Sequence, residues 1–309
     1  MRVLVTEPVH PDTLVELAAA GHDVIDRPAD LMAALAEAEA VLVRTMKLGA
    51  DRIAAAPRLK IIAKHGAGVD NIDLAAAKAA GIAVTNTPGA NSGSVAEQAM
   101  MLILGLARSL SAQRIAARPD PAIAIRDLEG RRLTVVGWGA SAQKVARLAQ
   151  AFGMAVTVVW PRRAGGATDE GLPVAASLAA VLPVTDVLSL HLPLSPATRD
   201  MIGAAELAAL PAGAIVINTA RGGLIDEVAL ADSLRAGHLG GAGLDVLAQE
   251  PIRADEPLRD VPNVMLTPHL AGMGDRGFRA TGLMAAGAIG DYLAGRLDPA
   301  MTIVAPPAA

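Results

Sequence analysis

Short apolar runs that alternate with helix-length stretches constrain the fold of this 309-residue chain more than any other feature. Each run is four residues long and consists mostly of Val, Ile, Leu and Ala, and the stretches between the runs are rich in Ala and Leu. Strands that are apolar on both faces and separated by helices predict a parallel sheet covered by helices on both sides. The runs are Arg2 to Val5, Ala40 to Val43, Lys60 to Ala63, Leu133 to Val136, Val156 to Val159, Val187 to Leu190 and Ala214 to Ile217.

The runs fall into two sets, so we expect two doubly wound α/β domains. The first set ends near residue 95, and the second begins at Leu133, after an irregular stretch from Arg118 to Arg132. A helix pattern from Ser94 to Ser109 lies between them, and residues 283–296 form another. A chain of this length has room for two cores of ordinary size. We expect residues 1–95 with 283–309 to form one domain and residues 96–282 the other.

Composition excludes several classes of protein. The absence of Cys excludes disulfides and thiolate metal sites, and the six His residues lack the spacing of metal ligands, so we expect no metal. Apolar stretches such as Ala99 to Leu104 are far too short to span a bilayer, and Met1 to Pro8 lacks the apolar core of a signal peptide. A net charge of -4 with scattered signs offers no basic surface for nucleic acid. We therefore expect a cytoplasmic protein with a small-molecule partner.

A glycine-rich turn follows the run Leu133 to Val136. It reads Gly137-Trp138-Gly139-Ala140-Ser141-Ala142, leads into a helix from Gln143 to Phe152 and fits G-x-G-x-x-G/A. The first glycine permits a tight turn, the second lets the backbone approach a pyrophosphate, and the small third residue lets helix and strand pack closely. Free N–H groups at the helix start then bind the anion. The pattern favours dinucleotide binding, although such a turn is also a common structural device.

The end of the next strand bears on which dinucleotide is bound. An NAD-selective site places Asp or Glu there against the adenosine ribose. Here the chain reads Trp160-Pro161-Arg162-Arg163, which contains no carboxylate and two guanidinium groups suited to a 2'-phosphate. We therefore favour NADP, with NAD still possible. Trp160 could stack on the adenine or cap the loop, and both arginines could instead be solvated loop charges.

Longer motifs in both halves resemble those of the D-isomer-specific 2-hydroxyacid dehydrogenase family. Their order and spacing match over nearly the whole chain, and the likeness is greatest to phosphoglycerate dehydrogenases and hydroxypyruvate or glyoxylate reductases. The motifs are Lys64 to Asp73 (KHGAGVDNID), Asn86 to Asn91 (NTPGAN) with Val95 to Glu97, His191 to Leu194 (HLPL), Asn218 to Asp226 (NTARGGLID), Gly243 to Val246 (GLDV), Glu250-Pro251 and Thr267 to His269 (TPH).

The resemblance implies a flavodoxin-like substrate domain and a Rossmann cofactor domain with a cleft between them. It also implies three catalytic residues. Arg221 would grip the carboxylate and keto oxygen of the substrate with its planar, permanently charged fork. His269 would donate a proton to that oxygen as hydride reaches the carbon. Glu250 would orient the imidazole and favour its protonated form. Taken singly, each could be an ordinary surface or core residue.

Further contacts follow from the same resemblance. The backbone N–H groups of Gly68 and Val69 would hold the substrate carboxylate. His65 would line the site or support it, and His191 would be structural. Homodimerisation is implied, with the helix from Ser94 as a candidate interface whose apolar face could equally be internal core. Beyond the glycine turn, the residues expected at the cofactor are Pro193, Thr219, Ala220, Asp245 and Gly272.

Some alternatives stay open at this stage. The chain could be a catalytically silent NAD(P)-sensing protein of the same superfamily, although the set of Arg221, Glu250 and His269 argues against it. It could also act on another oxidisable anion, such as phosphite or formate. Arg44, Lys47 and Lys64 could bind a second anionic group of the substrate or be ordinary surface charges. The substrate itself is expected to belong to the hydroxypyruvate, glyoxylate or phosphohydroxypyruvate class.

Overall fold

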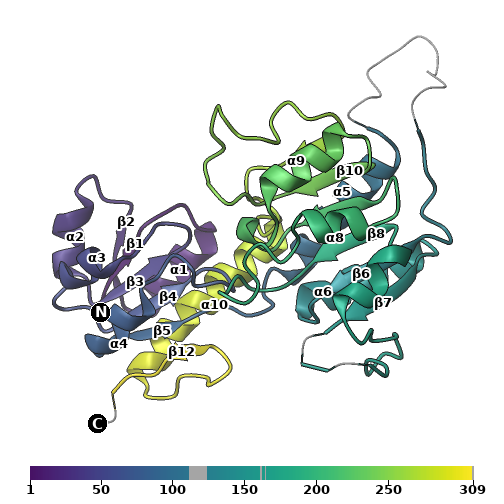
Figure 1. Ribbon diagram of the computed structural model, residues 1–309. Coiled ribbons are helices and arrows are strands. Elements are labelled where there is room, and N and C mark those ends of the chain that lie inside the picture. Colours follow the sequence, from purple (N-terminus) through teal and green to yellow (C-terminus); the bar gives the residue numbers. More distant parts are fainter. Residues whose placement is uncertain (111–123, 161, 164, 308–309) are drawn as a thin grey trace. The chain divides into compact units, whose positions relative to one another are not determined.

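The computed structural model describes residues 1–110, 124–160, 162–163 and 165–307 (Figure 1). They form two compact units. Unit 1 comprises residues 1–91 and 272–309, and unit 2 comprises residues 92–271. Each unit is built on one six-stranded sheet. Among the described residues, no helix is long and apolar enough to cross a membrane.

Unit 1 has the strand order β12-β5-β4-β3-β1-β2, in which only β12 is antiparallel to its neighbour. Without β12 this is the flavodoxin-like order 2-1-3-4-5. The strands are β1 (Arg2–Val5), β2 (Asp23–Asp26), β3 (Ala40–Val43), β4 (Ile61–Lys64), β5 (Ala83–Thr85) and β12 (Thr302–Val304). The helices are α1 (Pro11–Ala19), α2 (Leu31–Glu37), α3 (Ala50–Ala54), α4 (Leu74–Ala79) and α10 (Asp275–Leu293).

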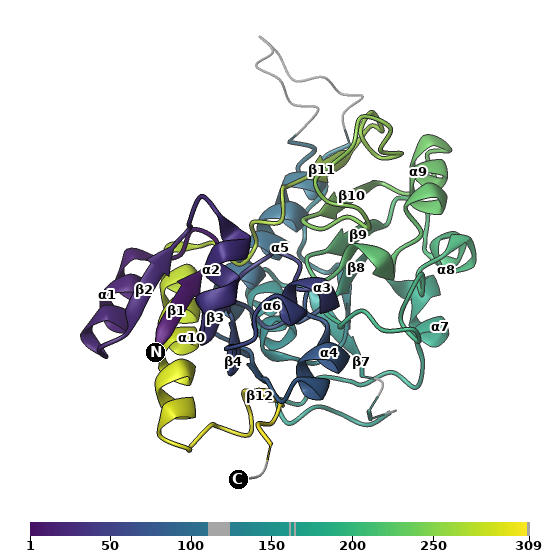
Figure 2. The ribbon, with the colours of Figure 1, turned by 90° about the vertical axis from the view of Figure 1, so that its left-hand side faces the viewer.

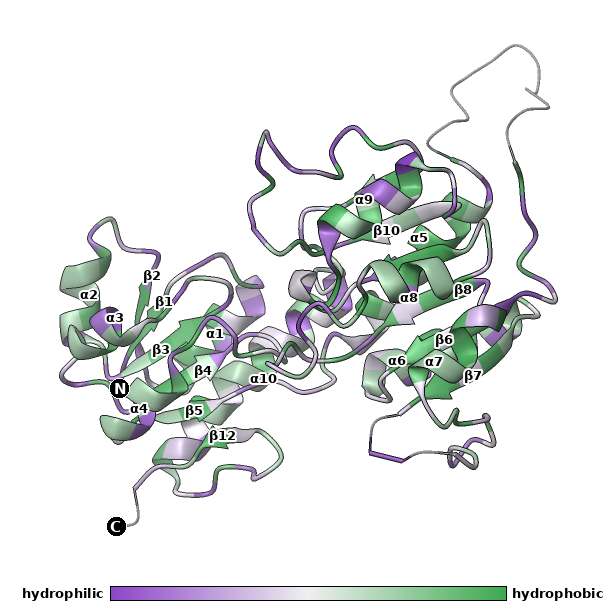
Figure 3. Cartoon of the chain, viewed as in Figure 1, coloured by the Kyte–Doolittle hydropathy of each residue, from purple (hydrophilic) through white to green (hydrophobic). Residues whose placement is uncertain are grey.

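The core of unit 1 lies on both faces of its sheet, as side-chain alternation along a strand requires. Val3 and Val5 contribute to the core under α1 and α10, whereas Leu4 contributes to the core under α2, α3 and α4. Figure 3 shows the strands mostly in hydrophobic colours and many loops in hydrophilic ones. The predicted parallel sheets with helices on both sides are confirmed.

Unit 2 has the parallel order β11-β10-β9-β8-β6-β7, and β8 to β11 lie side by side in Figure 2. A single bridge between Val158 and Val174 adds a rudimentary strand beyond β7, which completes the Rossmann order 3-2-1-4-5-6. The strands are β6 (Arg132–Val136), β7 (Ala155–Val159), β8 (Val187–Leu190), β9 (Ile215–Asn218), β10 (Gly241–Leu244) and β11 (Val264–Leu266). The helices are α5 (Ser92–Ala107), α6 (Ala140–Ala151), α7 (Leu178–Val181), α8 (Ala204–Ala209) and α9 (Glu227–Arg235), with short 3-10 turns η1 (Leu182–Val184) and η2 (Gly222–Leu224).

The boundaries of the units differ from the expected ones. Helix α10 begins at Asp275 rather than near residue 283, and its first half packs on α1, where Arg279 pairs with Asp12 and Gly282 lies against Thr13. Residues 272–282 therefore belong with unit 1. Helix α5 begins at Ser92 and buries most of its side chains in the core of unit 2, so residues 92–95 belong there. Most of the apolar surface of α5 is thus internal core. The expected irregular stretch falls partly outside the described residues.

Candidate active site

The glycine turn lies at the carboxyl end of β6, beside the carboxyl end of β8. This is the point where the strand order of unit 2 reverses, and dinucleotides bind at such switch points. Gly137 has φ +98°, and a Cβ there would lie 2.4 Å from the carbonyl oxygen of His191, so only glycine fits. Ala142 is fully buried, as the close packing of helix and strand requires.

The helix that follows presents its N-terminus without a side-chain cap. Gly139 is the N-cap of α6 and has no side chain to accept a hydrogen bond from the first turn, and a Cβ on Gly139 would meet no atom of the described residues within 4 Å. Ala140 and Ser141 form the start of this turn, so their N–H groups belong to the uncapped end. Open space in front of uncapped N–H groups suits a phosphate.

The residues after β7 lie where a cofactor ribose is expected. Trp160 is half-buried against the core of unit 2. Arg162 and Arg163 are exposed, and the Nη1 of Arg163 lies 3.5 Å from an Oδ1 of the exposed Asp169. Exposed ion pairs of this kind contribute little, so both guanidinium groups can turn to a ligand. Pro161 lies outside the described residues.

Two further predicted cofactor residues follow β9. Thr219 is buried, and its Oγ1 has no hydrogen-bond partner among the described residues. The side chain of Asn218 holds this turn, accepting from the N–H of Ala220 at 3.0 Å and donating to the carbonyl of Arg221 at 2.7 Å. A buried hydroxyl without a protein partner is available to a bound water or ligand. Pro193 follows β8 and is exposed.

Arg221 follows directly in the chain and precedes η2. Its Nη1 donates to the carbonyl of Ala220 at 2.6 Å. Gly222 packs on the peptide between Leu247 and Ala248 so closely that a Cβ would lie 1.9 Å from the Leu247 carbonyl carbon. The turn that carries Arg221 is therefore fixed against the loop that leads to Glu250.

His269 and Glu250 form a hydrogen-bonded pair. The Nδ1 of His269 lies 2.8 Å from the Oε2 of Glu250, and their side chains are 42% and 37% exposed. Glu250 also accepts from the N–H of Leu247 at 3.1 Å. Burial acts to raise the pKa of Glu250, but the hydrogen bond and charge of His269, the Leu247 N–H and the charge of Arg221 together hold it below its ordinary value. The carboxylate is thus ionised at neutral pH and leaves the Nε2 of His269 for a substrate.

Asp245 organises the backbone around His269. It is buried, and its Oδ1 accepts from the hydroxyl of Thr267 at 2.6 Å and the N–H of Leu270 at 3.0 Å, while its Oδ2 accepts from the N–H of Ala271 at 2.8 Å. His269 has φ +51°, a conformation that side-chain-bearing residues rarely adopt without support. Sequence reasoning placed Asp245 at the cofactor and overlooked this structural duty, because the partners of the carboxylate are backbone groups that no motif reveals.

The predicted substrate loop belongs to unit 1. Gly68 and Val69 follow the carboxyl end of β4 and are half-buried. The loop is held at Gly66, whose N–H donates to the Oγ1 of Thr87 at 2.9 Å, and at Ala67, whose carbonyl accepts from Asn86 at 2.6 Å. Lys64 is buried, and its Nζ donates to the Oδ1 of Asn71 at 2.6 Å, so this loop already uses it.

Both predicted non-catalytic histidines are neutral at physiological pH. Burial is the main cause that lowers the pKa of His65 to about 4, with the charge of Arg44 adding to it. Its ring lies 5.0 Å from that of Phe278, and its Nε2 has no partner among the described atoms. Burial likewise lowers the pKa of His191 to about 4, and its Nε2 lies 2.9 Å from the Oγ of Ser189.

Gly272, the remaining predicted cofactor residue, begins the second segment of unit 1. A Cβ at this position would lie 2.4 Å from the Nδ2 of Asn91, whose side chain would have to turn aside. Its expected contact with a cofactor stays a prediction.

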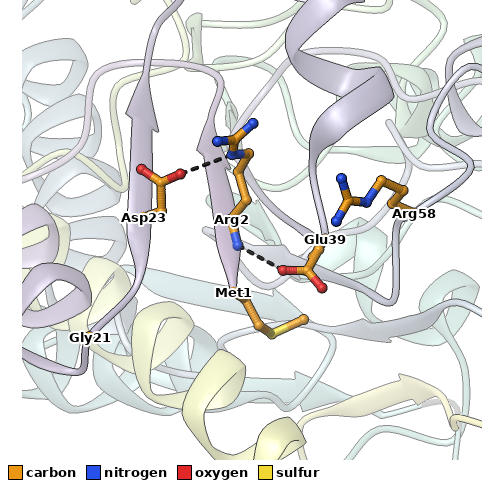
Figure 4. Close-up of a pocket in the computed structure, with 6 residues that line it drawn as sticks. All are labelled: Met1, Arg2, Gly21, Asp23, Glu39 and Arg58. Carbon is orange, nitrogen blue, oxygen red and sulfur yellow. Dashed lines mark hydrogen bonds and ion pairs between the residues drawn. The ribbon is translucent and has the colours of Figure 1, made fainter.

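A surface hollow of about 350 Å³ in unit 1 lies elsewhere on the sheet (Figure 4). It is bounded by the amino ends of β1, β2 and β3, opposite the carboxyl edge that carries Gly68 and Val69. Arg2 crosses it, with its Nε 2.9 Å from Asp23 and its backbone N–H 3.0 Å from Glu39. Because ligands of open parallel sheets bind at the carboxyl edge, this hollow is not the substrate site.

Comparison with known proteins decides the family. Residues 99–271, more than half of the chain, match the model of the D-isomer specific 2-hydroxyacid dehydrogenase, NAD binding domain. The chain belongs to this family. The resemblance seen in its motifs is thereby confirmed, and unit 2 contains its NAD-binding domain.

Similar proteins have named activities. D-3-phosphoglycerate dehydrogenase of Mycobacterium tuberculosis is 40% identical over 283 residues, covering 87% of this chain and 52% of the relative. The chain thus spans about half the length of the phosphoglycerate dehydrogenases that it matches. Hydroxypyruvate reductase of Thermotoga maritima is 40% identical over 250 residues, covering 78% and 80%.

Solved structures share the fold. A D-lactate dehydrogenase of Aquifex aeolicus, complexed with NAD and lactic acid, has a TM-score of 0.86 at 27% identity, covering 99% of this chain and 100% of the other. A Thermus thermophilus protein has a TM-score of 0.87 at 34% identity, covering 98% and 100%.

Proposed function

We propose that the protein interconverts a small D-2-hydroxy acid and its 2-keto acid with a nicotinamide dinucleotide. The observation that carries this proposal is the 2.8 Å hydrogen bond between His269 and Glu250, in a chain of this family and in the same unit as Arg221. When bound, the dinucleotide supplies or accepts the hydride. The protein must supply the proton, the anion anchor and the orientation.

His269 supplies the proton. Its Nδ1 is tied to Glu250, so Nε2 is the atom that donates to the keto oxygen during reduction and takes the proton back during oxidation. Glu250 stabilises the imidazolium because it is itself ionised. Arg221 anchors the carboxylate and polarises the keto oxygen. In unit 1, the N–H groups of Gly68 and Val69 are the further carboxylate donors that we propose.

The residues of unit 2 fit a dinucleotide. Gly137 and Gly139 shape the pyrophosphate turn. The buried hydroxyl of Thr219, which has no hydrogen-bond partner among the described residues, is available to the cofactor. The other residues of unit 2 proposed to line this site are Ala140, Ser141, Trp160, Pro193, Ala220 and Asp245, and Gly272 of unit 1 is proposed as a further cofactor residue. Arg162 and Arg163 favour NADP over NAD, because no carboxylate stands at the end of β7 to pair with a free ribose hydroxyl.

The substrate that we propose is hydroxypyruvate, glyoxylate or phosphohydroxypyruvate, and the expected assembly is a homodimer. Helix α5 offers Met101, 39% exposed, as an apolar residue for such a contact. Light scattering of the purified chain across a concentration series tests the assembly.

Steady-state oxidation of NADPH and NADH with each of the three keto acids tests the activity, with His269→Ala as the inactive reference. We expect turnover that disappears in this variant. Tight binding of dinucleotide without turnover of any keto acid would instead favour a silent sensing protein. For cofactor choice, Arg162→Ala/Arg163→Ala should weaken NADPH binding about tenfold or more and leave NADH binding unchanged. The matched control Arg259→Ala, at another exposed arginine of unit 2, should change neither.

A further inference from the structure

Glu227 lies beside the candidate active site, although no motif called attention to it. It is the first residue of α9, and Asp226 caps that helix, accepting at 3.0 Å from the N–H groups of Val228 and Ala229. Glu227 is not needed for that cap. Its half-buried side chain turns instead to the loop after β10, where its Oε1 accepts from the N–H of Ala248 at 2.6 Å.

Two consecutive peptide groups, Val246–Leu247 and Leu247–Ala248, connect three parts of the site. The N–H of Leu247, in the first, donates to Glu250 at 3.1 Å, and the N–H of Ala248, in the second, donates to Glu227. Gly222 packs against the second peptide without room for a Cβ. Because the two peptides share Leu247, movement of the second would shift both the donor to Glu250 and the turn of Arg221.

We propose that Glu227 is a positioning residue for the site of Arg221, Glu250 and His269, because its hydrogen bond with the Ala248 N–H holds the peptide between Leu247 and Ala248 in place. This inference rests on the proposed function of those three residues. It assigns to Glu227 a role that acts through its neighbours, without contact with the substrate.

The surroundings of Glu227 make its charge responsive near neutral pH. Burial is the main cause that raises the pKa of Glu227 to about 7, and the charges of Glu256, Asp200 and Glu250 add to the rise, against the N–H of Ala248. Of the cations around this loop, Arg221 and His269 act on Glu250, and Arg199 lies over Gly223. As pH rises through about 7, Glu227 ionises, and the Ala248 N–H then donates to a charged acceptor.

The two duties of Glu227 can be separated by substitution. Glu227→Gln keeps an acceptor oxygen for Ala248 but cannot ionise, whereas Glu227→Ala removes both the acceptor and the charge. Glu206 offers a matched control, because it also lies in the first turn of a helix of unit 2 and accepts from a backbone N–H, that of Gly203, at 3.0 Å.

The experiment is the pH profile of keto acid reduction by the full chain and its variants. We expect Glu227→Ala to lower kcat about tenfold or more with little change in the KM for the dinucleotide. Glu227→Gln should keep kcat within about twofold at pH 6, where Glu227 is itself largely protonated. At pH 8, where the wild type offers Ala248 a charged acceptor, its kcat should fall more than about twofold below the wild type. Glu206→Gln should do neither. Wild-type kcat in Glu227→Ala, or coincident profiles of the wild type and Glu227→Gln, would overturn the proposal.

A second readout keeps the inference independent of the substrate. Hydrogen exchange of the Leu247 and Ala248 amides can be followed in the wild type, Glu227→Ala and Glu227→Gln. We expect the Ala248 amide to exchange about tenfold faster or more in Glu227→Ala, and to keep wild-type protection in Glu227→Gln at pH 6. Unchanged exchange in Glu227→Ala overturns the role of Glu227, whereas absence of keto acid turnover with faster exchange overturns only the proposed function.

Discussion

Replacing Asp245 by Asn should release the backbone that carries His269. The carboxylate uses both oxygens: Oδ1 serves Thr267 and Leu270, and Oδ2 serves Ala271 at 2.8 Å. An amide has one acceptor oxygen, so whichever way the Asn turns, its NH2 group faces a backbone N–H. One hydrogen bond to a charged group, worth about 1.5–3 kcal/mol, is lost, and a buried donor is left unpaired. We therefore expect Asp245→Asn to lower the free energy of unfolding by about 3 kcal/mol.

That cost should appear locally and in catalysis. About 3 kcal/mol corresponds to a roughly hundredfold larger open population of the segment 267–271. kcat should fall in proportion to the fraction of molecules in which that segment is open. Denaturant unfolding, hydrogen exchange of the segment and steady-state kinetics measure the three effects.

The control for this substitution is Asp226→Asn. Asp226 accepts two backbone N–H groups on the single oxygen Oδ1, so an amide oxygen can replace it, and Asn caps helices about as well as Asp. Asp226→Asn should lower the free energy of unfolding by less than about 0.5 kcal/mol. Equal losses in the two variants, or unchanged exchange of the Leu270 and Ala271 amides in Asp245→Asn, would refute the reasoning.

Three further predictions concern the cofactor turn, acid stability and the catalytic pair. Gly139→Ala should have the same free energy of unfolding as the wild type, because the added methyl group meets no atom of the described residues within 4 Å. Its affinity for the dinucleotide in fluorescence titrations should be at least about tenfold lower, because the methyl group occupies the space through which the phosphate approaches the backbone. The pKa values of His65 and His191 are about 4 in the folded protein, so as pH falls the unfolded chain binds protons at these residues first. The free energy of unfolding should therefore fall by about 1.4 kcal/mol per pH unit for each histidine between about pH 6.5 and 4. His65→Gln should reduce this slope in denaturant unfolding. Glu250→Gln should lower kcat/KM about tenfold at neutral pH. The pKa of Glu250 is below its ordinary value in the folded protein, so the wild type keeps the ionised Glu250–His269 pair until the pH falls below the usual range of a glutamate. The difference in the free energy of unfolding between the wild type and Glu250→Gln should therefore vanish only in strong acid.

The seven apolar runs match β1, β3, β4, β6, β7, β8 and β9 to within one residue, because strands covered on both faces must be continuously apolar. They do not include β2, β5, β10, β11 or β12, and β10 contains two glycines. A Cβ on Gly243 would lie 2.8 Å from the Cβ of Leu102, and one on Gly241 would lie 2.9 Å from Leu106, so these glycines let α5 lie close to the strand. The need for glycine at these positions comes from the contact with α5, and the local sequence of the strand gives no sign of that contact. The glycines of α10 likewise weaken the helix pattern in the sequence, so the predicted start at residue 283 is later than the start at Asp275 in the structure.

The candidate site divides along a similar line. Arg221, Glu250 and His269 could be chosen from motifs because each is a reactive side chain in a conspicuous pattern. Asp245 and Glu227 act through backbone N–H groups of residues 21 to 26 positions away, and such contacts depend on how two loops meet. Both carboxylates serve loops that leave the carboxyl ends of neighbouring strands of unit 2. The reactive residues could therefore be named from the sequence, whereas the groups that hold them in place follow from the strand order, since it alone brings the loops after β9, β10 and β11 together.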